Sequence, residues 1–237
     1  MTIYPAIDML GGKCVRLCQG DYNESTIYHD SPAHAAKEWE DKGAEWIHLV
    51  DLDGAKAKKP VNLEAIKAVR EAVKCKLELG GGIRCEEDIR LLLDMGIDRV
   101  ILGTAAVTNP FFMYQMAQKY GDKIAVGLDA KDNKVATNGW LETDTQDVFE
   151  YAEFMEKIGV RTIIFTDIAT DGMLSGPNLE AMDKMRKTCK TMNVIASGGV
   201  SCLDDIVQLK NVGVDGVIAG KALYTNNLSL EDAINVG

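Results

Sequence analysis

The sequence has little of the positive charge that several classes of protein require. It carries 26 Lys and Arg against 36 Asp and Glu, so the net charge is −10 and the pI is about 4.8. This balance argues against a general surface for nucleic acid or anionic membranes, which needs clustered basic residues. It leaves room for an anionic small molecule, because a few backbone amides and one or two cations suffice to bind a phosphate.

Long apolar runs and metal-binding patterns are also missing. No run approaches the roughly 20 residues of a membrane helix, and the start MTIYPAIDML lacks the basic stretch and long apolar core of a signal peptide. The six cysteines form no CxxC pair and there are only three histidines, so no spaced set of metal ligands appears. We therefore expect reduced thiols in a cytoplasmic protein without a metal, a membrane partner or a nucleic-acid partner.

What is present is a regular alternation of strand-like and helix-like segments. Runs such as WIHLV, RVIL and TIIF are almost continuously apolar, which is typical of parallel strands buried on both faces. About eight such units predict one α/β domain over residues 1–237, a closed (β/α)8 TIM barrel. An open doubly wound sheet is the alternative, and it is disfavoured because no GxGxxG loop follows the first strand.

Turn and cap residues set the expected boundaries. Ser31 and Pro32 are typical of a helix N-cap and first helical position, and Gly43 is typical of a helix end. Loops are expected over Met9 to Asp30, over Leu52–Val61 and around the NGW motif, with a helix from Thr145 to Lys157. The expected strands are Thr2–Asp8, Trp46–Asp51, Lys76–Leu79, Arg99–Leu102, Lys123–Asp129, Thr162–Asp167, Asn193–Ala196 and Gly216–Ala219.

The two halves of the chain repeat each other. The stretch GGGIRCEEDIRLLLDMGIDRVILGTAAV from Gly80 aligns with SGGVSCLDDIVQLKNVGVDGVIAGKALY from Ser197 at a constant offset of 117 residues. This match indicates two homologous half-barrels, about 1–120 and 121–237, without the shorter period of a solenoid. Matching strand ends should therefore face each other across the mouth of the barrel, where these folds carry their chemistry.

Two aspartates occupy matching strand ends. Asp8 ends IYPAID and Asp129 ends IAVGLD, half a chain later. Two carboxylates across a barrel mouth suit general acid–base catalysis, in which one takes a proton while the other gives one. One of them must then stay protonated at neutral pH, which needs burial or a nearby negative charge. A single strand-end aspartate would more simply cap its loop, but the matched pair favours catalysis.

Glycines follow the other strand ends, again in matched sets. They let backbone N–H groups approach an anion without a Cβ in the way. Tight turns alone are the alternative, but two matched sets favour two opposite phosphate sites, and hence a substrate with a phosphate at each end. No nucleophile elbow or strand-end lysine for covalent catalysis stands out, so we expect proton transfer without a cofactor. The predicted phosphate-binding residues are Gly81, Gly82, Gly103 and Thr104 in one set, and Gly198, Gly199, Gly220 and Lys221 in the other.

Motifs along essentially the whole chain resemble the phosphoribosylformimino-aminoimidazole-carboxamide ribotide isomerases of histidine biosynthesis. In order, these motifs are PAIDMLGGKCVRLCQGDY, HLVDLDGA, KPVNL, LGGGIR, ILGTAAV, NGW, TDIATDGMLSGPN, ASGGV and GKALY. The resemblance implies an Amadori rearrangement that converts a bisphosphorylated aminoaldose into an aminoketose. It also implies that Asp129 is the general acid that helps to open the ribose ring, and that Asp8 is the base that removes the C2 proton.

The resemblance further implies residues that bind the substrate. Arg16, Thr166 and Asp171 match substrate-contacting positions, and Trp140 matches a tryptophan that stacks on the aminoimidazole ring. Gly172 is expected to add an amide to the second phosphate site. Without the resemblance, Arg16 reads as a solvated loop cation, and Asp171 with Gly172 as a turn. Lys58-Lys59 departs from the family pattern, which has a glycine and one basic residue there.

Other functions remain open at this point. The cyclase subunit of imidazole glycerol phosphate synthase is a related barrel with two aspartates that needs a glutaminase partner, but GGKCVRLCQGDY, KPVNL and NGW resemble the isomerase. The sequence does not decide whether the protein also isomerises phosphoribosylanthranilate. A non-catalytic phosphosugar-binding barrel would not need the acid pair. We expect a monomer whose loops after strands one, five and six close over a small-molecule bisphosphate.

Overall fold

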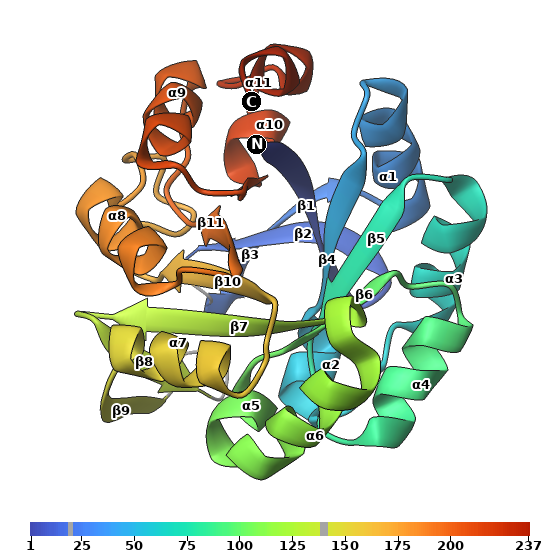
Figure 1. The fold of residues 1–237 in the computed structure, drawn as a ribbon. Helices are drawn as coiled ribbons and strands as arrows, with labels where there is room; N and C mark the ends of the chain where they lie inside the picture. Colours follow the sequence, from blue (N-terminus) through green and yellow to red (C-terminus); the bar gives the residue numbers. More distant parts are fainter. Residues whose placement is uncertain (19–20, 138–141) are drawn as a thin grey trace.

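Eight parallel strands close into a barrel in the computed structural model, which describes residues 1–18, 21–137 and 142–237 (Figure 1). Each strand pairs with the next, and β12 pairs with β1 to complete the ring. The predicted TIM barrel is confirmed, and the open doubly wound sheet is wrong because of this closing pair. The barrel strands are β1 (Thr2–Leu10), β4 (Trp46–Asp51), β5 (Lys76–Gly80), β6 (Arg99–Leu102), β7 (Ile124–Lys131), β10 (Thr162–Asp167), β11 (Asn193–Ser197) and β12 (Gly216–Ala219).

Helices surround the barrel and bury the outer faces of its strands (Figure 1). A second, smaller apolar cluster contains Tyr4, Ile101, Ile164, Ile195 and Ile218 from five different barrel strands. Burial on both faces explains why the strand sequences are almost continuously apolar. The surrounding helices are α1 (Pro32–Asp41), α3 (Leu63–Ala72), α4 (Glu86–Asp94), α6 (Pro110–Tyr120), α7 (Val148–Lys157), α8 (Leu179–Thr188), α9 (Leu203–Val212) and α11 (Leu230–Val236).

Helix ends follow the expected cap chemistry. The Ser31 hydroxyl accepts a hydrogen bond from the His34 amide at 3.4 Å, and Pro32 occupies the first turn of α1. Gly43 follows the end of this helix with φ +96°, a left-handed conformation that favours glycine. Asn178 caps α8 by accepting from the Ala181 amide at 3.1 Å. The Ser-Pro and glycine signals therefore located α1 correctly.

Two segments predicted as loops form β-hairpins instead. β2 (Lys13–Cys18) and β3 (Asp21–His29) occupy most of the expected loop from Met9, and β2 pairs antiparallel with β1. After β7, the strands β8 (Lys134–Thr137) and β9 (Glu142–Asp147) do the same, so the helix predicted from Thr145 begins only at Val148. The sequences of these hairpins carry many polar residues, unlike those of the buried barrel strands. The strands β1 and β7 consequently run two residues beyond Asp8 and Asp129.

Short helices replace other predicted turns. α2 (Leu52–Ala57) lies within the expected loop after β4, and the Asp51 carboxylate caps it by accepting from the Gly54 amide at 2.8 Å. α5 (Thr104–Thr108) and α10 (Lys221–Tyr224) begin directly after Gly103 and Gly220, and a 3₁₀ turn, η1 (Gly121–Lys123), precedes β7. Such one-turn helices have too few residues for a visible apolar periodicity.

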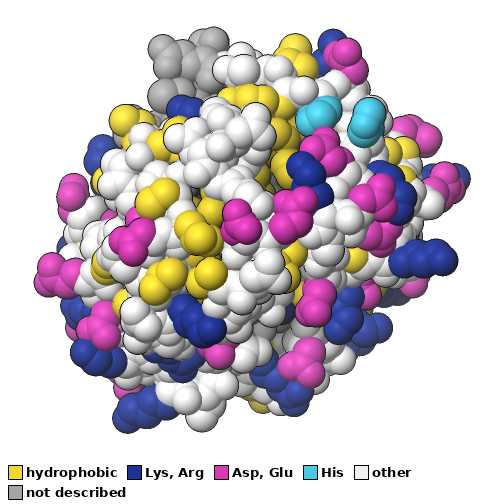
Figure 2. All heavy atoms as spheres, turned by 90° about the horizontal axis from the view of Figure 1, so that it is seen from above, with side chains coloured by type: hydrophobic (Ala, Val, Ile, Leu, Met, Phe, Trp, Pro, Cys, Tyr) yellow, Lys and Arg dark blue, Asp and Glu magenta, His cyan; other side chains and the backbone are white. Residues whose placement is uncertain are grey.

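The outer surface is mixed in charge. Acidic and basic side chains are interspersed on the face shown in Figure 2, with apolar side chains between them. None of the helices in the described parts of the chain combines the length and apolarity that crossing a membrane requires.

Candidate active site

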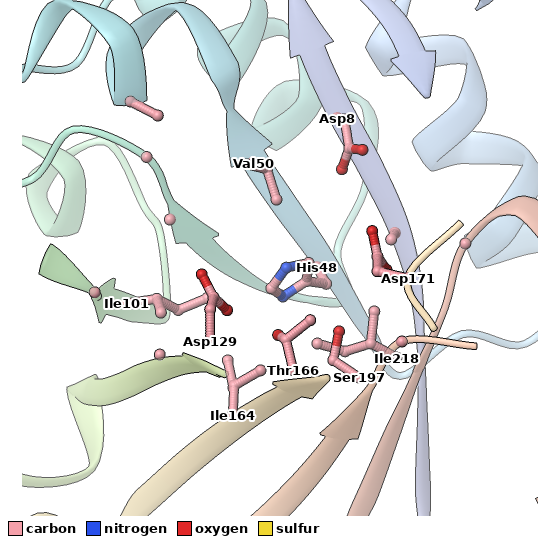
Figure 3. A pocket seen from close by; sticks show the side chains of 18 of the residues that line it. Asp8, His48, Val50, Ile101, Asp129, Ile164, Thr166, Asp171, Ser197 and Ile218 are labelled. Carbon is pink, nitrogen blue, oxygen red and sulfur yellow. The ribbon is translucent and has the colours of Figure 1, made fainter. Parts of the chain in front are cut away.

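A pocket of about 280 Å³ opens at the C-terminal ends of the barrel strands (Figure 3). It brings together all of the predicted site residues that the structure describes, whereas Trp140 lies outside the described residues. The predicted residues that line it are Asp8, Arg16, Gly81, Gly82, Gly103, Thr104, Asp129, Thr166, Asp171, Gly172, Gly198, Gly199, Gly220 and Lys221.

Asp8 forms an ion pair with Arg16 at one side of this pocket. The antiparallel pairing of β1 with β2 sets Val15 opposite Asp8, and the next residue, Arg16, donates from Nη1 to Asp8 Oδ2 at 2.8 Å. Both side chains are largely buried, with 12% and 13% of their surface exposed. Burial lowers the pKa of Arg16, but the carboxylates of Asp8 and Asp171 outweigh it and raise this pKa overall. The reading of Arg16 as a solvated loop cation is therefore wrong.

Asp129 and Asp171 add two further carboxyl groups to the pocket. Asp129 lies beside Thr166 in the β7–β10 pairing, and Asp171 belongs to the loop between β10 and α8. In Figure 3, Asp129 is on the other side of His48 from Asp8 and Asp171. Burial raises the pKa of Asp171; the Arg16 guanidinium lowers it, and the charges of Asp8 and Asp129 raise it further. The net effect raises the pKa of Asp171 above its ordinary value.

The glycines after β5 and β11 are required by the fold itself. Gly81 has φ +113°, and a Cβ on it would lie 2.2 Å from the Asp51 carbonyl oxygen. Gly198 has φ +97°, and a Cβ there would lie 2.8 Å from the Asp167 carbonyl oxygen. Both backbones therefore pass too close to a neighbouring strand end for any side chain. Both turns also line the pocket, so a structural role and phosphate binding are compatible.

Gly103 and Gly220 have similar backbone angles, but the atoms around them differ. Their angles are φ −96°, ψ −101° and φ −114°, ψ −101°. A Cβ on Gly103 would meet only the Gly127 carbonyl oxygen, at 3.8 Å, whereas a Cβ on Gly220 would lie 2.6 Å from Cζ of Arg16. Arg16 is therefore packed directly on the backbone of Gly220.

Lys221 links two walls of the pocket. It lies at the start of α10, and its Nζ donates to the Gly172 carbonyl oxygen at 2.9 Å. The ammonium group is thus held beside the loop that carries Asp171, with hydrogens still available for an anion.

Four largely buried side chains that were not predicted from the sequence, His48, Glu78, Arg99 and Tyr4, form what we call the polar ladder. His48 lines the pocket, and its Nδ1 lies 2.6 Å from Glu78 Oε1. The Arg99 guanidinium donates to Glu78 through Nε at 2.9 Å and to the Tyr4 hydroxyl at 3.1 Å. The available signal was an ionisable residue inside the apolar runs KLELG and RVIL, since buried charges must be paired.

Within the described residues, no three His, Cys, Asp or Glu side chains are grouped so that they could hold a metal ion. The arrangement offers instead several carboxyl groups, one buried arginine and two sets of glycine turns around one pocket. Such a set of groups can bind an anionic molecule and move protons to and from it.

Comparison with known proteins gives full-length matches. The family model described as "Histidine biosynthesis protein" matches residues 2–229. A protein of Shouchella clausii is 52% identical over 236 residues, covering 100% of this chain and 98% of its own. A protein of Bacillus subtilis is 52% identical over 236 residues (98% and 96%), and one of Synechocystis is 50% identical over 237 residues (99% and 92%). All three are named 1-(5-phosphoribosyl)-5-((5-phosphoribosylamino)methylideneamino)imidazole-4-carboxamide isomerase.

Proposed function

The chain belongs to the histidine biosynthesis protein family, and we propose that it catalyses the reaction named for its full-length relatives. It is an isomerase that converts a bisphosphorylated aminoaldose of histidine biosynthesis into the aminoketose. The main support for this function is that about half of the residues, over the whole chain, are identical to those of proteins named as this isomerase. The relatives' names favour the isomerase over the cyclase subunit and over a non-catalytic sugar-phosphate binder.

Asp8 is the proposed base of this reaction. It removes the proton from C2 of the ring-opened substrate, which gives an enolamine that tautomerises to the ketone as C1 gains a proton. The 2.8 Å ion pair with Arg16 supports this role, because it balances the charge of the carboxylate and fixes its direction in a largely buried site.

The proposed acid delivers a proton to the ribose ring oxygen as the ring opens. The family resemblance assigns this step to Asp129, on the other side of His48 from Asp8 in Figure 3. Asp171 is a second candidate for the same step, because it lines the same pocket and burial raises its pKa. Asp129→Asn and Asp171→Asn separate the two: the variant that lacks the acid loses ring opening, whereas the other keeps measurable turnover.

The two phosphates of the substrate are proposed to bind the two sets of glycine turns. The first set includes Gly81 and Gly103, and the second includes Gly198 and Gly220 with the ammonium group of Lys221. Support comes from their position on one pocket and from the backbone amides that such turns present. Thr104, Gly172 and the remaining glycines of each pair would complete these sites.

We also propose that the barrel arose from two homologous half-barrels. Equivalent contacts recur at equivalent places: Asn62 donates to the Asp51 carboxylate at 2.7 Å, and Asn178 donates to the Asp167 carboxylate at 2.6 Å. Residues 116 positions apart thus make the same interaction at the ends of β4 and β10. This likeness supports the duplication that the sequence repeat indicated.

A direct assay tests the proposed function. Purified protein is incubated with the aminoaldose bisphosphate alone, and formation of the ketose is followed by NMR. We expect conversion without a protein partner or an added cofactor, and no ketose under these conditions would refute the proposal. Asp8→Asn should abolish turnover and still bind substrate in calorimetry, so a nearly normal rate in this variant would remove its assigned role. The same assay with phosphoribosylanthranilate decides whether the chain has that second activity.

The remaining expectations concern the setting in which the protein acts. We propose a cytoplasmic monomer that needs no nucleic acid. The acidic net charge of −10 and the free thiols of Cys14, Cys75, Cys85, Cys189 and Cys202 support this setting. Light scattering on the eluting protein would check the mass, and a dimer would correct the proposal.

A further inference from the structure

The polar ladder crosses the barrel interior at one level. His48, Glu78 and Arg99 lie on the neighbouring strands β4, β5 and β6 and are direct register partners. Glu78 has a fully buried side chain, and those of His48 and Arg99 are 12% and 8% exposed. The ladder therefore runs from the active-site pocket, at His48, through the barrel to Arg99 at the start of β6.

The other half of the barrel shows that the fold does not need this ladder. The equivalent positions on β10, β11 and β12 are Ile164, Ile195 and Gly216, which are register partners in the same way. None of these three residues is ionisable, and the space beside Gly216 is taken by the Tyr4 ring, whose Cε2 would lie 2.6 Å from a Cβ there. Burying an ion pair is seldom stabilising compared with apolar residues of similar volume, so the ladder calls for an explanation other than stability.

The charges of the ladder fix which nitrogen of His48 carries a proton. Burial raises the pKa of Glu78, but His48 and the Arg99 guanidinium outweigh it and hold this pKa below its ordinary value. Glu78 is therefore a carboxylate, which can only accept hydrogen bonds. Since Nδ1 of His48 lies 2.6 Å from Glu78 Oε1, Nδ1 must carry the hydrogen. Nε2 is then the nitrogen left for the pocket.

We propose that Glu78 and Arg99 are positioning residues for the isomerase, holding His48 as the Nδ1–H tautomer so that Nε2 accepts a hydrogen bond from a substrate hydroxyl. The identity of the partner as a sugar hydroxyl rests on the proposed function. Arg99 acts through Glu78. Its guanidinium donates to the Tyr4 hydroxyl and lies 4.4 Å from the centre of the Trp46 ring. Held in this way, Arg99 fixes the position of the Glu78 carboxylate.

The ladder also makes the two halves of the active site chemically different. Asp8 and Asp129 occupy equivalent places in the two half-barrels, but His48 stands where the second half has Ile164. Only one side of the pocket therefore presents an imidazole to the substrate. This asymmetry suits a reaction in which the two aspartates have opposite roles.

The first test is spectroscopic and does not depend on activity. The chain has three histidines, so protein labelled with ¹⁵N-histidine gives a simple long-range ¹H–¹⁵N spectrum of the rings, with His29 and His34 as internal references. We expect His48 as the pure Nδ1–H tautomer in the free enzyme. An Nε2–H tautomer, a ring that carries hydrogens on both nitrogens, or the mixture of a free imidazole would overturn the proposal even if the protein isomerises its substrate.

The second test is a double-mutant cycle on activity. Glu78→Leu with Arg99→Met removes both charges at similar volume, so that no buried charge is left unpaired. We expect this double variant and His48→Ala each to lower kcat/KM about 10- to 100-fold, the range of one hydrogen bond made in the active site. Because Glu78 and Arg99 act through His48, the triple variant should be no slower than His48→Ala. Multiplied losses, or an unchanged double variant, would refute the positioning role.

Two controls separate positioning from stability. Glu156→Gln weakens a carboxylate that accepts from the Thr191 and Met192 amides at 2.6 and 3.0 Å on the outside of the barrel. It should lower the melting temperature while leaving kcat/KM and the His48 spectrum unchanged. If the double variant does not fold, Glu78→Gln retains the shape of the side chain, and a ring spectrum identical to that of the unmutated protein would then contradict the proposal.

Discussion

The contact between Arg16 and Gly220 gives a prediction with a built-in control. In Gly220→Ala the new methyl carbon would lie 2.6 Å from Cζ of Arg16, whereas ordinary contacts begin near 3.4 Å. The backbone has φ −114°, so the alanine is not forced into the left-handed region, and the guanidinium must move instead. Its movement breaks the 2.8 Å bond to Asp8. A charge-assisted hydrogen bond contributes about 1.5–3 kcal/mol, so we expect kcat/KM to fall by about 10- to 150-fold.

Gly103→Ala is the matched control. Gly103 has almost the same backbone angles, but its methyl group would meet only one carbonyl oxygen at 3.8 Å. Steady-state kinetics on both variants should show a clearly larger loss for Gly220→Ala than for Gly103→Ala, because only the methyl group at position 220 would also displace Arg16. Equal losses would mean that each glycine is needed for the approach of substrate, and the reasoning from Arg16 would be refuted.

Three further predictions concern stability. Gly82→Ala would place a methyl carbon 2.2 Å from the Gly54 carbonyl oxygen, on a backbone with φ +80°. A denaturant titration should therefore show that the free energy of unfolding falls by about 3 kcal/mol or more. A fall of less than about 1 kcal/mol would contradict so close a packing of the two backbones. Glu40 accepts from the Lys74 and Cys75 amides, which outweigh its desolvation and lower its pKa to about 2. Glu40→Gln should therefore destabilise the protein by about 2 kcal/mol at pH 7, and this difference should disappear as the pH falls from about 4.5 to about 2. The pKa of Asp171 is raised in the folded protein, so its ionisation destabilises the fold as the pH rises through that pKa. Asp171→Asn should therefore raise the melting temperature more at pH 7 than at pH 4. An equal rise at both pH values would contradict this.

The barrel could be predicted from the sequence because its signals are repeated. Parallel strands covered on both faces leave apolar runs such as TIIF, and the glycine and Ser-Pro signals bound the segments between them. The hairpins β2–β3 and β8–β9 could not be found in this way. Their strands pair at the mouth of the barrel, and a sequence such as DYNEST has no apolar alternation to mark a strand.

The candidate site was predicted where residues come in matched pairs. Asp8 and Asp129, like the glycines, were located by their equivalent places in the two halves, and the structure brings them to one pocket. His48 was overlooked because it has no counterpart in the second half and lies inside an apolar run. Its proposed role depends on Glu78 and Arg99, which are 30 and 51 residues further along the chain; strand pairing brings Glu78 beside His48, and Arg99 beside Glu78.

The near-equivalence of the two sets of glycine turns has a consequence for the direction of binding. A ligand with a phosphate at each end could sit between two similar anion sites either way round, and half of such encounters would present the wrong carbon to the base. The phosphate sites alone cannot select one orientation, since both ends of the ligand offer the same group. The two sides differ in Arg16, which packs on Gly220, and in His48, which replaces an isoleucine, and both side chains line the same pocket. In this barrel the two phosphates of a ligand would therefore set its position, and the side chains that differ between the halves would set its orientation.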